Sequence, residues 1–233
     1  MGRIIIAGGD EAGRGAVLGP LVTGVISVKS SSIQRLSDIG VRDSKMLSRK
    51  RREYLYDEIY SIAEEVKVSL IGADEISRAM INGISLNELE AVHFAKIIDS
   101  MESAVSTIFI DSPDVVQEKF GIRISMISHK PLEVNKRRKS RQESIKLISE
   151  HKADVKYPVV SGASIIAKVV RDREMDKLKS KLKIDIGSGY PSDTRTIDAI
   201  RSNLSNAALV QHIRTKWKTL ELIKQMKIID FLT

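Results

Sequence analysis

The sequence predicts an α/β fold in which helices cover the faces of a mixed β-sheet. Short apolar runs that end at glycine or aspartate are typical of buried strands, and such runs alternate with longer segments whose apolar residues recur at helical spacing. The chain opens with strands that can pair through a turn and continues with strand–helix units, an order that favours antiparallel and parallel neighbours in one sheet. With 233 residues, 42% of them hydrophobic, the chain can bury one substantial core.

Each element follows from one of these local patterns. In the first half we expect a strand over 3–7 that ends at Gly8 and Gly9, a second strand over 17–28 that pairs with it through a turn near Gly13 and Gly15, a helix over 48–65 and a strand over 66–71. In the second half we expect a helix from the capping box at Ser85 to about Ala104, strands over 107–110 and 122–127, a helix with Pro158 in its first turn, and helical structure in the last 40 residues.

The charge balance favours a nucleic-acid partner. Lysine and arginine number 38 against 30 acidic residues, which gives a net charge of +8 and a pI of about 9.6, and such an excess suits a polyanion. The absence of cysteine excludes disulfides, thiolate metal sites and cysteine nucleophiles. No apolar run approaches the roughly 18 residues of a membrane span. Because residues 1–7 are too short for a signal peptide, we expect a cytoplasmic protein.

Two adjacent carboxylates, Asp10 and Glu11, follow the first expected strand. Side chains alternate between the faces of a strand, so both acids can reach one site only if the strand ends or bends there. The neighbouring glycines permit such a bend. Carboxylates at a strand end are suitable oxygen ligands for Mg²⁺ or Mn²⁺, and the alternative is an ordinary turn with solvated acids.

Two further acids stand where a site can form. Asp111 follows a buried strand, and the carboxyl ends of strands are where α/β folds place ligands, although an aspartate also suits the start of a turn. Asp154 precedes the helix that begins near Pro158, and alone it would be a loop acid or a helix cap. Together with Asp10 and Glu11 these acids suffice for a two-metal site. Such a site clamps the attacking and leaving oxygens of a phosphodiester without a side-chain nucleophile.

Five segments of the sequence occur in the order of the motifs of one family. They are Asp10 to Gly15 with Gly19 and Pro20, then Asp43-Ser44-Lys45, the strand ending at Asp111, Asp154 through Ser161-Gly162-Ala163-Ser164 to Lys168, and Gly187 to Pro191. This set resembles ribonuclease HII, the type 2 ribonuclease H family, and the archaeal-type branch is the most similar. The resemblance runs from about Ile4 to Trp217.

The resemblance implies a ribonuclease H-like fold, with a mixed five-stranded sheet flanked by helices over residues 1–190 and a C-terminal helical extension over 191–233. It implies that Asp10, Glu11, Asp111 and Asp154 are catalytic acids that bind two Mg²⁺ or Mn²⁺ ions. The implied activity is cleavage of the RNA strand of RNA–DNA hybrids, and of duplex DNA on the 5′ side of embedded ribonucleotides. The implied products carry 5′-phosphate and 3′-hydroxyl ends.

The resemblance also implies a site that reads the sugar. Gly13, Arg14 and Gly15 resemble the loop that recognises the 2′-hydroxyl at an RNA–DNA junction. This agrees with physical reasoning, because glycines let backbone groups approach the sugar and the 2′-hydroxyl distinguishes RNA from DNA. Tyr190 resembles the tyrosine that stacks beside the junction ribose, and packing in the core is its alternative role.

Further residues resemble contacts to the nucleic-acid strands. Asp43, Ser44 and Lys45 resemble substrate-strand contacts, with Lys45 on a phosphate. Lys168 and Arg171 are candidates to face the phosphate backbone, and solvation on a helix surface is the alternative for both.

The chain departs from the family pattern at a few positions. Gly9 stands where the family usually has isoleucine or valine, Ala16 where proline is usual, Gly162 in place of a common alanine, and Lys216 where serine is typical. Alanine in place of proline leaves the unfolded chain freer, so the departure at Ala16 bears on the rigidity of the loop near Gly13. All four acids are kept.

The C-terminal tail resembles the box by which replication proteins dock on the sliding clamp. Gln225 is followed by Ile228, Phe231 and Leu232, with Leu232 in place of the usual second aromatic residue. A terminal segment can reach a partner, and packing of the apolar tail on its own domain is the alternative. The basic run 136–139 is either a phosphate contact or a solvated loop.

Two other functions are compatible with parts of this pattern. The sibling type 3 ribonuclease H usually carries an extra N-terminal domain, whereas here the first catalytic strand is expected from Arg3. A non-catalytic hybrid-binding or clamp-adaptor protein is the third hypothesis. The four acids argue against it, because a binder gains nothing from negative charge facing phosphates unless metal is present.

Overall fold

The computed structural model describes residues 4–41, 46–135, 144–217 and 220–221. Three groups of expected contact residues lie outside these ranges: Asp43, Ser44 and Lys45; the basic run 136–139; and the tail residues Gln225, Ile228, Phe231 and Leu232. Their roles stay predictions from the sequence.

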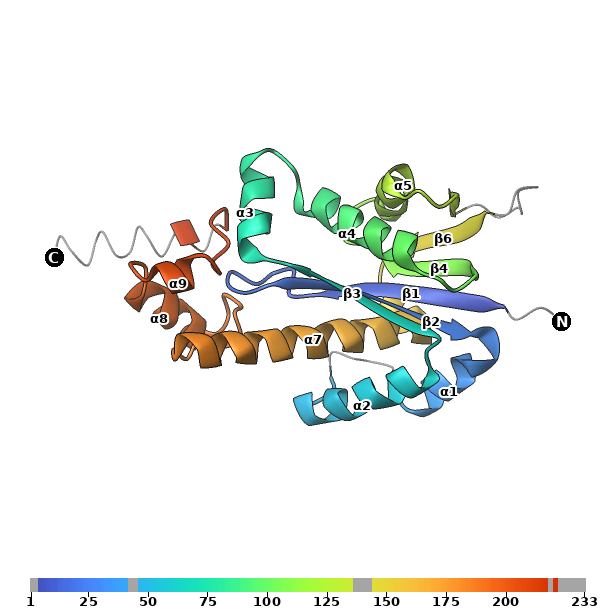
Figure 1. Ribbon diagram of the computed structural model, residues 1–233, viewed down its shortest axis with the longest axis horizontal. Helices are drawn as coiled ribbons and strands as arrows, with labels where there is room; N and C mark the ends of the chain where they lie inside the picture. The colour runs from blue at the N-terminus through green and yellow to red at the C-terminus, as the bar shows by residue number, and fades with distance from the viewer. Residues whose placement is uncertain (1–3, 42–45, 136–143, 218–219, 222–233) are drawn as a thin grey trace. The chain divides into compact units, whose positions relative to one another are not determined.

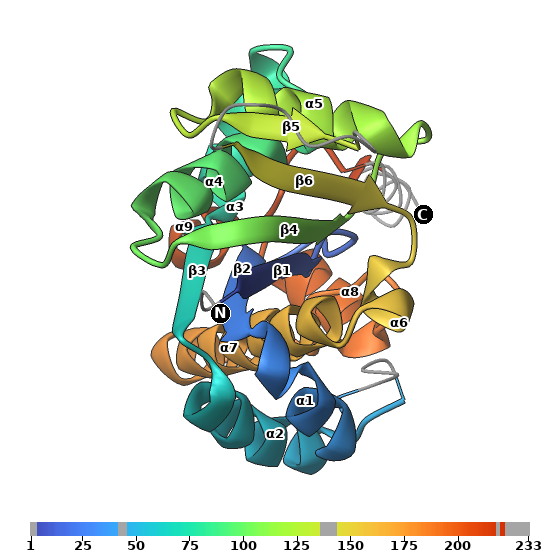
Figure 2. The same cartoon turned by 90° about the vertical axis from the view of Figure 1, so that its right-hand side faces the viewer.

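The described strands form one mixed sheet in the order β3-β2-β1-β4-β6-β5. They are β1 (Ile5–Ala12), β2 (Leu21–Lys29), β3 (Glu65–Ile71), β4 (Val105–Asp111), β5 (Leu132–Val134) and β6 (Ile145–Glu150). β1 pairs antiparallel with β2 and parallel with β4, and β6 pairs parallel with both β4 and β5. Figure 2 shows β5, β6, β4 and β1 following one another across the sheet. The mixed α/β architecture is confirmed, with six described strands in place of the five expected.

The helices connect and cover these strands. They are α1 (Ile33–Asp38), which follows a short 3₁₀ turn, α2 (Arg49–Ile62), α3 (Ala73–Ile81), α4 (Leu86–Ser100), α5 (Gln117–Ile127), α6 (Ala153–Lys156), α7 (Pro158–Leu182), α8 (Thr194–Ser202) and α9 (Ala207–Val210). None of the described helices combines the length and hydropathy that crossing a membrane requires.

Helices approach the central strand β1 closely from both faces (Figure 1). On one face the start of α7 lies so near that a Cβ atom on Gly8 would be 2.4 Å from the carbonyl carbon of Val159. On the other face α4 contributes Phe94, and a Cβ atom on Gly9 would be 3.0 Å from its ring. The two glycines therefore let both helices pack against β1 directly beside Asp10.

One expected strand is a helix. The apolar run 122–127 predicts a strand, but it forms the C-terminal part of α5. Phe120 and Ile124 are buried while Ile122 and Met126 are exposed, which is the pattern of a helix with one face on the core. A short apolar run fits either structure, so its periodicity alone does not decide between them. The strands β5 and β6 lie on either side of 136–143 and were not expected.

The described residues form two compact units. The first draws on 1–12, 22–69 and 87–169, and its core contains Phe94 and Phe120 in an edge-to-face contact with centroids 5.8 Å apart. The second draws on 13–21, 70–86 and 170–233, and its core contains Leu18, Met175 and Ile200. This division is not the one expected near residue 190, so the two predicted domains stay a prediction.

Candidate active site

Asp10 and Glu11 lie inside β1 rather than after its end. The antiparallel partner β2 follows β1 to its last residue, with Asp10 opposite Gly24 and Glu11 opposite Thr23, whereas the parallel pairing with β4 stops at Gly9. The expectation that the strand ends before the two acids is therefore wrong, whereas a bend that lets both acids reach one site stays a prediction. Because side chains alternate along a strand, the Cα–Cβ bonds of the two acids are expected to point toward opposite faces of the sheet.

Asp10 is a buried carboxylate that contacts α7. The residue is only 6% exposed, and it accepts hydrogen bonds from the Ser164 hydroxyl and from the Glu11 amide, whose nitrogen lies 2.8 Å from Oδ1. Burial raises the pKa of Asp10 well above its ordinary value, and the negative charges of Glu11 and Asp111 raise it further. A carboxylate in these surroundings retains its charge most easily where a cation offsets it.

Asp111 is the last residue of β4, and the segment before α6 holds it in place. Its Oδ1 accepts a hydrogen bond from the Ala153 amide at 2.7 Å. Lys152, the residue before Ala153, has a φ of 55°, a left-handed conformation that is uncommon for a residue other than glycine. Asp154 follows in the first turn of α6 and is 6% exposed. The start of α6 therefore both restrains Asp111 and contains Asp154.

The donor chemistry of the four acids fits a divalent cation. Carboxylate oxygens are the ligands that Mg²⁺ and Mn²⁺ prefer, and the repulsion that raises the pKa of Asp10 is what a cation relieves. Within the described ranges, however, no three or more histidine, aspartate or glutamate side chains are arranged to hold one ion. Metal binding by the four acids therefore stays a prediction, supported by burial and charge.

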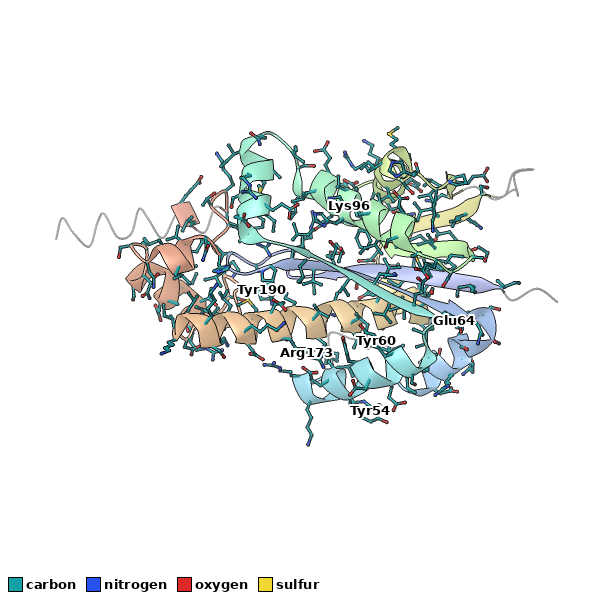
Figure 3. All side chains as sticks on the ribbon, in the orientation of Figure 1. Tyr54, Tyr60, Glu64, Lys96, Arg173 and Tyr190 are labelled. Atoms are coloured by element: carbon teal, nitrogen blue, oxygen red, sulfur yellow. The ribbon has the colours of Figure 1, made fainter. Side chains whose placement is uncertain are left out.

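The expected junction loop belongs to the second unit and is built around Arg171. Gly13 has a φ of +91°, and a Cβ atom there would lie 2.3 Å from the Arg171 Nε, so only glycine fits. The guanidinium of Arg171 lies over the ring of Tyr190 at 4.6 Å and donates to the Ser188 carbonyl at 3.0 Å. Figure 3 shows Tyr190 beside α7. A Cβ atom on Gly15 would lie 4.0 Å from the Tyr190 ring, so loop and tyrosine are neighbours.

Two candidate phosphate contacts on α7 have different surroundings. Arg171 is 4% exposed, so it is not a surface contact, and burial lowers the pKa of its guanidinium. Lys168 is half-buried and lies four residues after Ser164, which places it on the helix face that contacts Asp10. The geometry thus makes Arg171 a support for Tyr190 and leaves Lys168 as the candidate contact.

Arg214 fastens the junction loop, although no sequence motif pointed to it. Its side chain is fully buried, and its Nη1 donates to the Arg14 carbonyl at 2.9 Å. Its Nε and Nη2 donate to the Gly19 carbonyl at 3.2 and 3.1 Å, and its guanidinium lies 5.0 Å from the centre of the Trp217 ring. These partners are mostly backbone carbonyls some 200 residues earlier in the chain, so nothing local in the sequence signals the role.

Comparison with known proteins gives one family for nearly the whole chain. The family model of ribonuclease HII matches residues 7–220. Ribonuclease HII of Pyrococcus abyssi is 43% identical over 191 residues, which are 82% of this chain and 78% of the relative. The crystal structure of the ribonuclease H2 from Pyrococcus horikoshii OT3 matches with a TM-score of 0.81 and 38% identity, covering 97% of this chain and 99% of that chain.

Two further solved structures bear on the alternatives. The structure of the PCNA:RNase HII complex from Archaeoglobus fulgidus matches with a TM-score of 0.77 and 36% identity, over 92% of this chain and 96% of that chain. Bst-RNase HIII in complex with Mn²⁺ matches with a TM-score of 0.76 over 97% of this chain and 71% of that chain, but at 19% identity, which shows a shared fold alone. The predicted ribonuclease H-like fold and enzyme class are confirmed, and this chain belongs to the ribonuclease HII family.

Proposed function

We propose that this ribonuclease H hydrolyses the RNA strand of RNA–DNA hybrids and cuts duplex DNA on the 5′ side of embedded ribonucleotides, leaving 5′-phosphate and 3′-hydroxyl ends. The observation that carries the proposal is the buried carboxyl of Asp10, with its pKa raised by burial and by the charges of Glu11 and Asp111, in a chain whose relatives are named ribonuclease HII. The net charge of +8 supports a polyanionic substrate.

In this proposal Asp10, Glu11, Asp111 and Asp154 hold two Mg²⁺ or Mn²⁺ ions. When bound, such ions lower the pKa of a water molecule and stabilise charge on the leaving 3′ oxygen. The chain's own groups prepare the acids for this task. The Ser164 hydroxyl fixes the orientation of the Asp10 carboxylate, and the Ala153 amide fixes that of Asp111.

The second part of the proposal concerns recognition of the ribose. Gly13, Arg14 and Gly15 form a turn in which Gly15 is exposed, and we propose that a backbone group of this turn contacts the 2′-hydroxyl. Arg171 fixes the plane of the Tyr190 ring, which we propose stacks on the sugar at the junction. We propose that Asp43, Ser44, Lys45 and Lys168 contact the nucleic-acid strands.

Cleavage of a DNA duplex that contains one ribonucleotide tests the proposal, with and without Mg²⁺ or Mn²⁺ and beside a long RNA–DNA hybrid. Asp10→Asn should abolish cutting. Asp57→Asn, the same chemical change at an exposed position on α2, should leave it intact. Extension of the upstream product by a polymerase identifies a 3′-hydroxyl. Absence of metal-dependent cutting by folded wild-type protein on both substrates would instead favour a non-catalytic hybrid-binding protein.

We also propose that the tail residues Gln225, Ile228, Phe231 and Leu232 dock on the replication sliding clamp. The support is the resemblance of the tail to a clamp-binding box and the PCNA complex of the Archaeoglobus fulgidus relative. A chain lacking residues 225–233 should lose clamp binding in calorimetry and keep its nuclease activity. Unchanged clamp binding by this truncated chain would refute the docking role.

A further inference from the structure

A fifth acid, Asp114, lies in the loop between β4 and α5 and is not among the expected site residues. The residue is buried, with 8% exposure. Its Oδ1 accepts a hydrogen bond from the Asn87 amide group at 2.5 Å, and its Oδ2 accepts one from the Arg123 Nε at 3.2 Å. Arg123 also approaches Glu88 at 3.4 Å. The Asp114 side chain therefore fastens its loop to α4 and α5 through a charge-assisted contact.

The backbone of Asp114 connects this loop to the one before α6. Its carbonyl oxygen lies 2.6 Å from the Nε2 of His151, so that nitrogen must carry the proton and donate. The amide of His151 donates to the Gln117 side chain at 3.1 Å, and the amide of Ser112 donates to the Glu150 carbonyl at 3.0 Å. Three hydrogen bonds thus join the two loops and the residues that flank them.

These two loops adjoin two of the four expected metal ligands. Asp111 precedes the first loop directly. His151 stands two residues before Ala153, whose amide holds Asp111 at 2.7 Å, and three residues before Asp154. Hydrogen bonds from Asn87 of α4 to Asp114, from His151 to Asp114 and from Ala153 to Asp111 therefore connect α4 to Asp111, and the backbone between His151 and Asp154 connects them to the second acid.

We propose that Asp114 is a positioning residue for divalent-cation binding: by anchoring its loop to α4 and α5 and presenting its carbonyl to His151, it sets the relative placement of Asp111 and Asp154. This inference rests on the proposed function, because it requires those two acids to be metal ligands. A residue that only stabilises the fold would lower the free energy of unfolding and leave cation affinity unchanged in the folded protein. A positioning residue changes the cation affinity itself.

The experiment uses the full chain and two readouts besides activity: hydrogen exchange of the Ala153 amide in metal-free protein, and Mn²⁺ binding by calorimetry. Asp114→Ala should speed the exchange at Ala153 and weaken Mn²⁺ binding by about 10–100-fold, the usual loss when a group that orients a metal ligand is removed. Glu88→Gln is the matched control, since it removes the other carboxylate beside Arg123 and should leave both readouts unchanged.

Two variants keep the test decisive if Asp114→Ala does not fold. His151→Gln retains a side-chain donor and should bind Mn²⁺ better than His151→Phe, which should show the same loss as Asp114→Ala. Unchanged Mn²⁺ affinity and unchanged Ala153 exchange in folded Asp114→Ala or His151→Phe would overturn the positioning role alone, provided that Asp111→Asn weakens Mn²⁺ binding. Full Mn²⁺ affinity in Asp111→Asn would overturn both this inference and the proposed metal site.

Discussion

Replacing Gly8 by alanine tests whether the close approach of α7 to β1 sets the active site. The added Cβ atom would lie 2.4 Å from the carbonyl carbon of Val159 and 2.5 Å from the amide nitrogen of Val160. Ordinary van der Waals contact begins at 3.4 Å, so strand and helix must separate by roughly 1 Å. Both obstacles are backbone atoms, which cannot rotate away as a side chain can.

This separation should affect stability and activity together. Overpacking of a core costs about 1–3 kcal/mol of unfolding free energy, and we expect about 3 kcal/mol because no side chain can yield. The same displacement acts on Asp10, two residues after Gly8, and on its hydrogen-bond partner Ser164 in α7. Misplacement of catalytic groups by about 1 Å lowers rates by roughly 100-fold, and we expect a loss of that order in cleavage.

The neighbouring Gly9→Ala variant is the matched control. Its added Cβ atom would meet Phe94 at 3.0 Å and Val25 at 3.3 Å, and both obstacles are side-chain atoms that can yield by a few tenths of an ångström. Removing a glycine from a strand also gains about 0.5–1 kcal/mol of unfolding free energy. We therefore expect stability within about 1 kcal/mol of wild type and nearly full activity.

Urea unfolding gives the stability of both variants, and cleavage of the single-ribonucleotide duplex gives their activity. If Gly8→Ala is as stable and as active as Gly9→Ala, the spacing between α7 and β1 does not control the site. If both variants lose stability equally, the cause lies in the strand itself rather than in the helix contact.

Three further predictions concern charged groups. In metal-free protein Asp10→Asn should raise the unfolding free energy at pH 7, because the pKa of Asp10 is raised in the folded state and burial there penalises its charge. Urea unfolding from pH 7 to 4 should show this gain in stability shrinking as the pH falls toward about 3.9, the pKa of aspartate in the unfolded chain. Asp193→Asn should show the opposite trend, since the hydrogen bonds from Arg195 and Ser188 lower the pKa of Asp193; its stability deficit at pH 7 should shrink as urea titrations move below about pH 4. Arg214→Met should lower the free energy of unfolding by about 3 kcal/mol or more, because it leaves buried carbonyls without donors. It should also raise KM in cleavage assays, because the loop at Gly13 loses this support. An unchanged KM would show that Arg214 does not affect substrate binding.

Strong local patterns predicted much of the fold. The capping box predicted α4 within a few residues, and Pro158 with the spaced apolar residues after it predicted the start of α7. The run 122–127 was assigned wrongly because six residues are too few for periodicity to separate a strand from a helix. The strand β6, with sequence IKLISE, is short and half polar, and its place in the sheet comes from pairing with β4 and β5.

The glycines before Asp10 show why the geometry of the site was harder to predict than its residues. From the sequence, Gly8 and Gly9 predict the end of a strand, since glycine weakens strands. In the structure they continue β1, because pairing with β2 and the close approach of α7 and Phe94 outweigh their local preference. The partners that orient the site, Ser164 for Asp10 and Ala153 for Asp111, come from segments distant in sequence.

The close packing around β1 also connects the fold to the proposed cation binding. Small residues on β1 and β2 let α7 bury Asp10: besides Gly8 on β1, a Cβ atom on Gly24 of β2 would lie 3.2 Å from the Ala163 carbonyl. That burial destabilises the charged carboxylate, as its raised pKa records. A divalent cation bound in the proposed site would offset this charge and compete with the proton for the carboxylate. In that proposal, the arrangement that weakens the metal-free fold would favour cation binding at Asp10 and make it sensitive to pH.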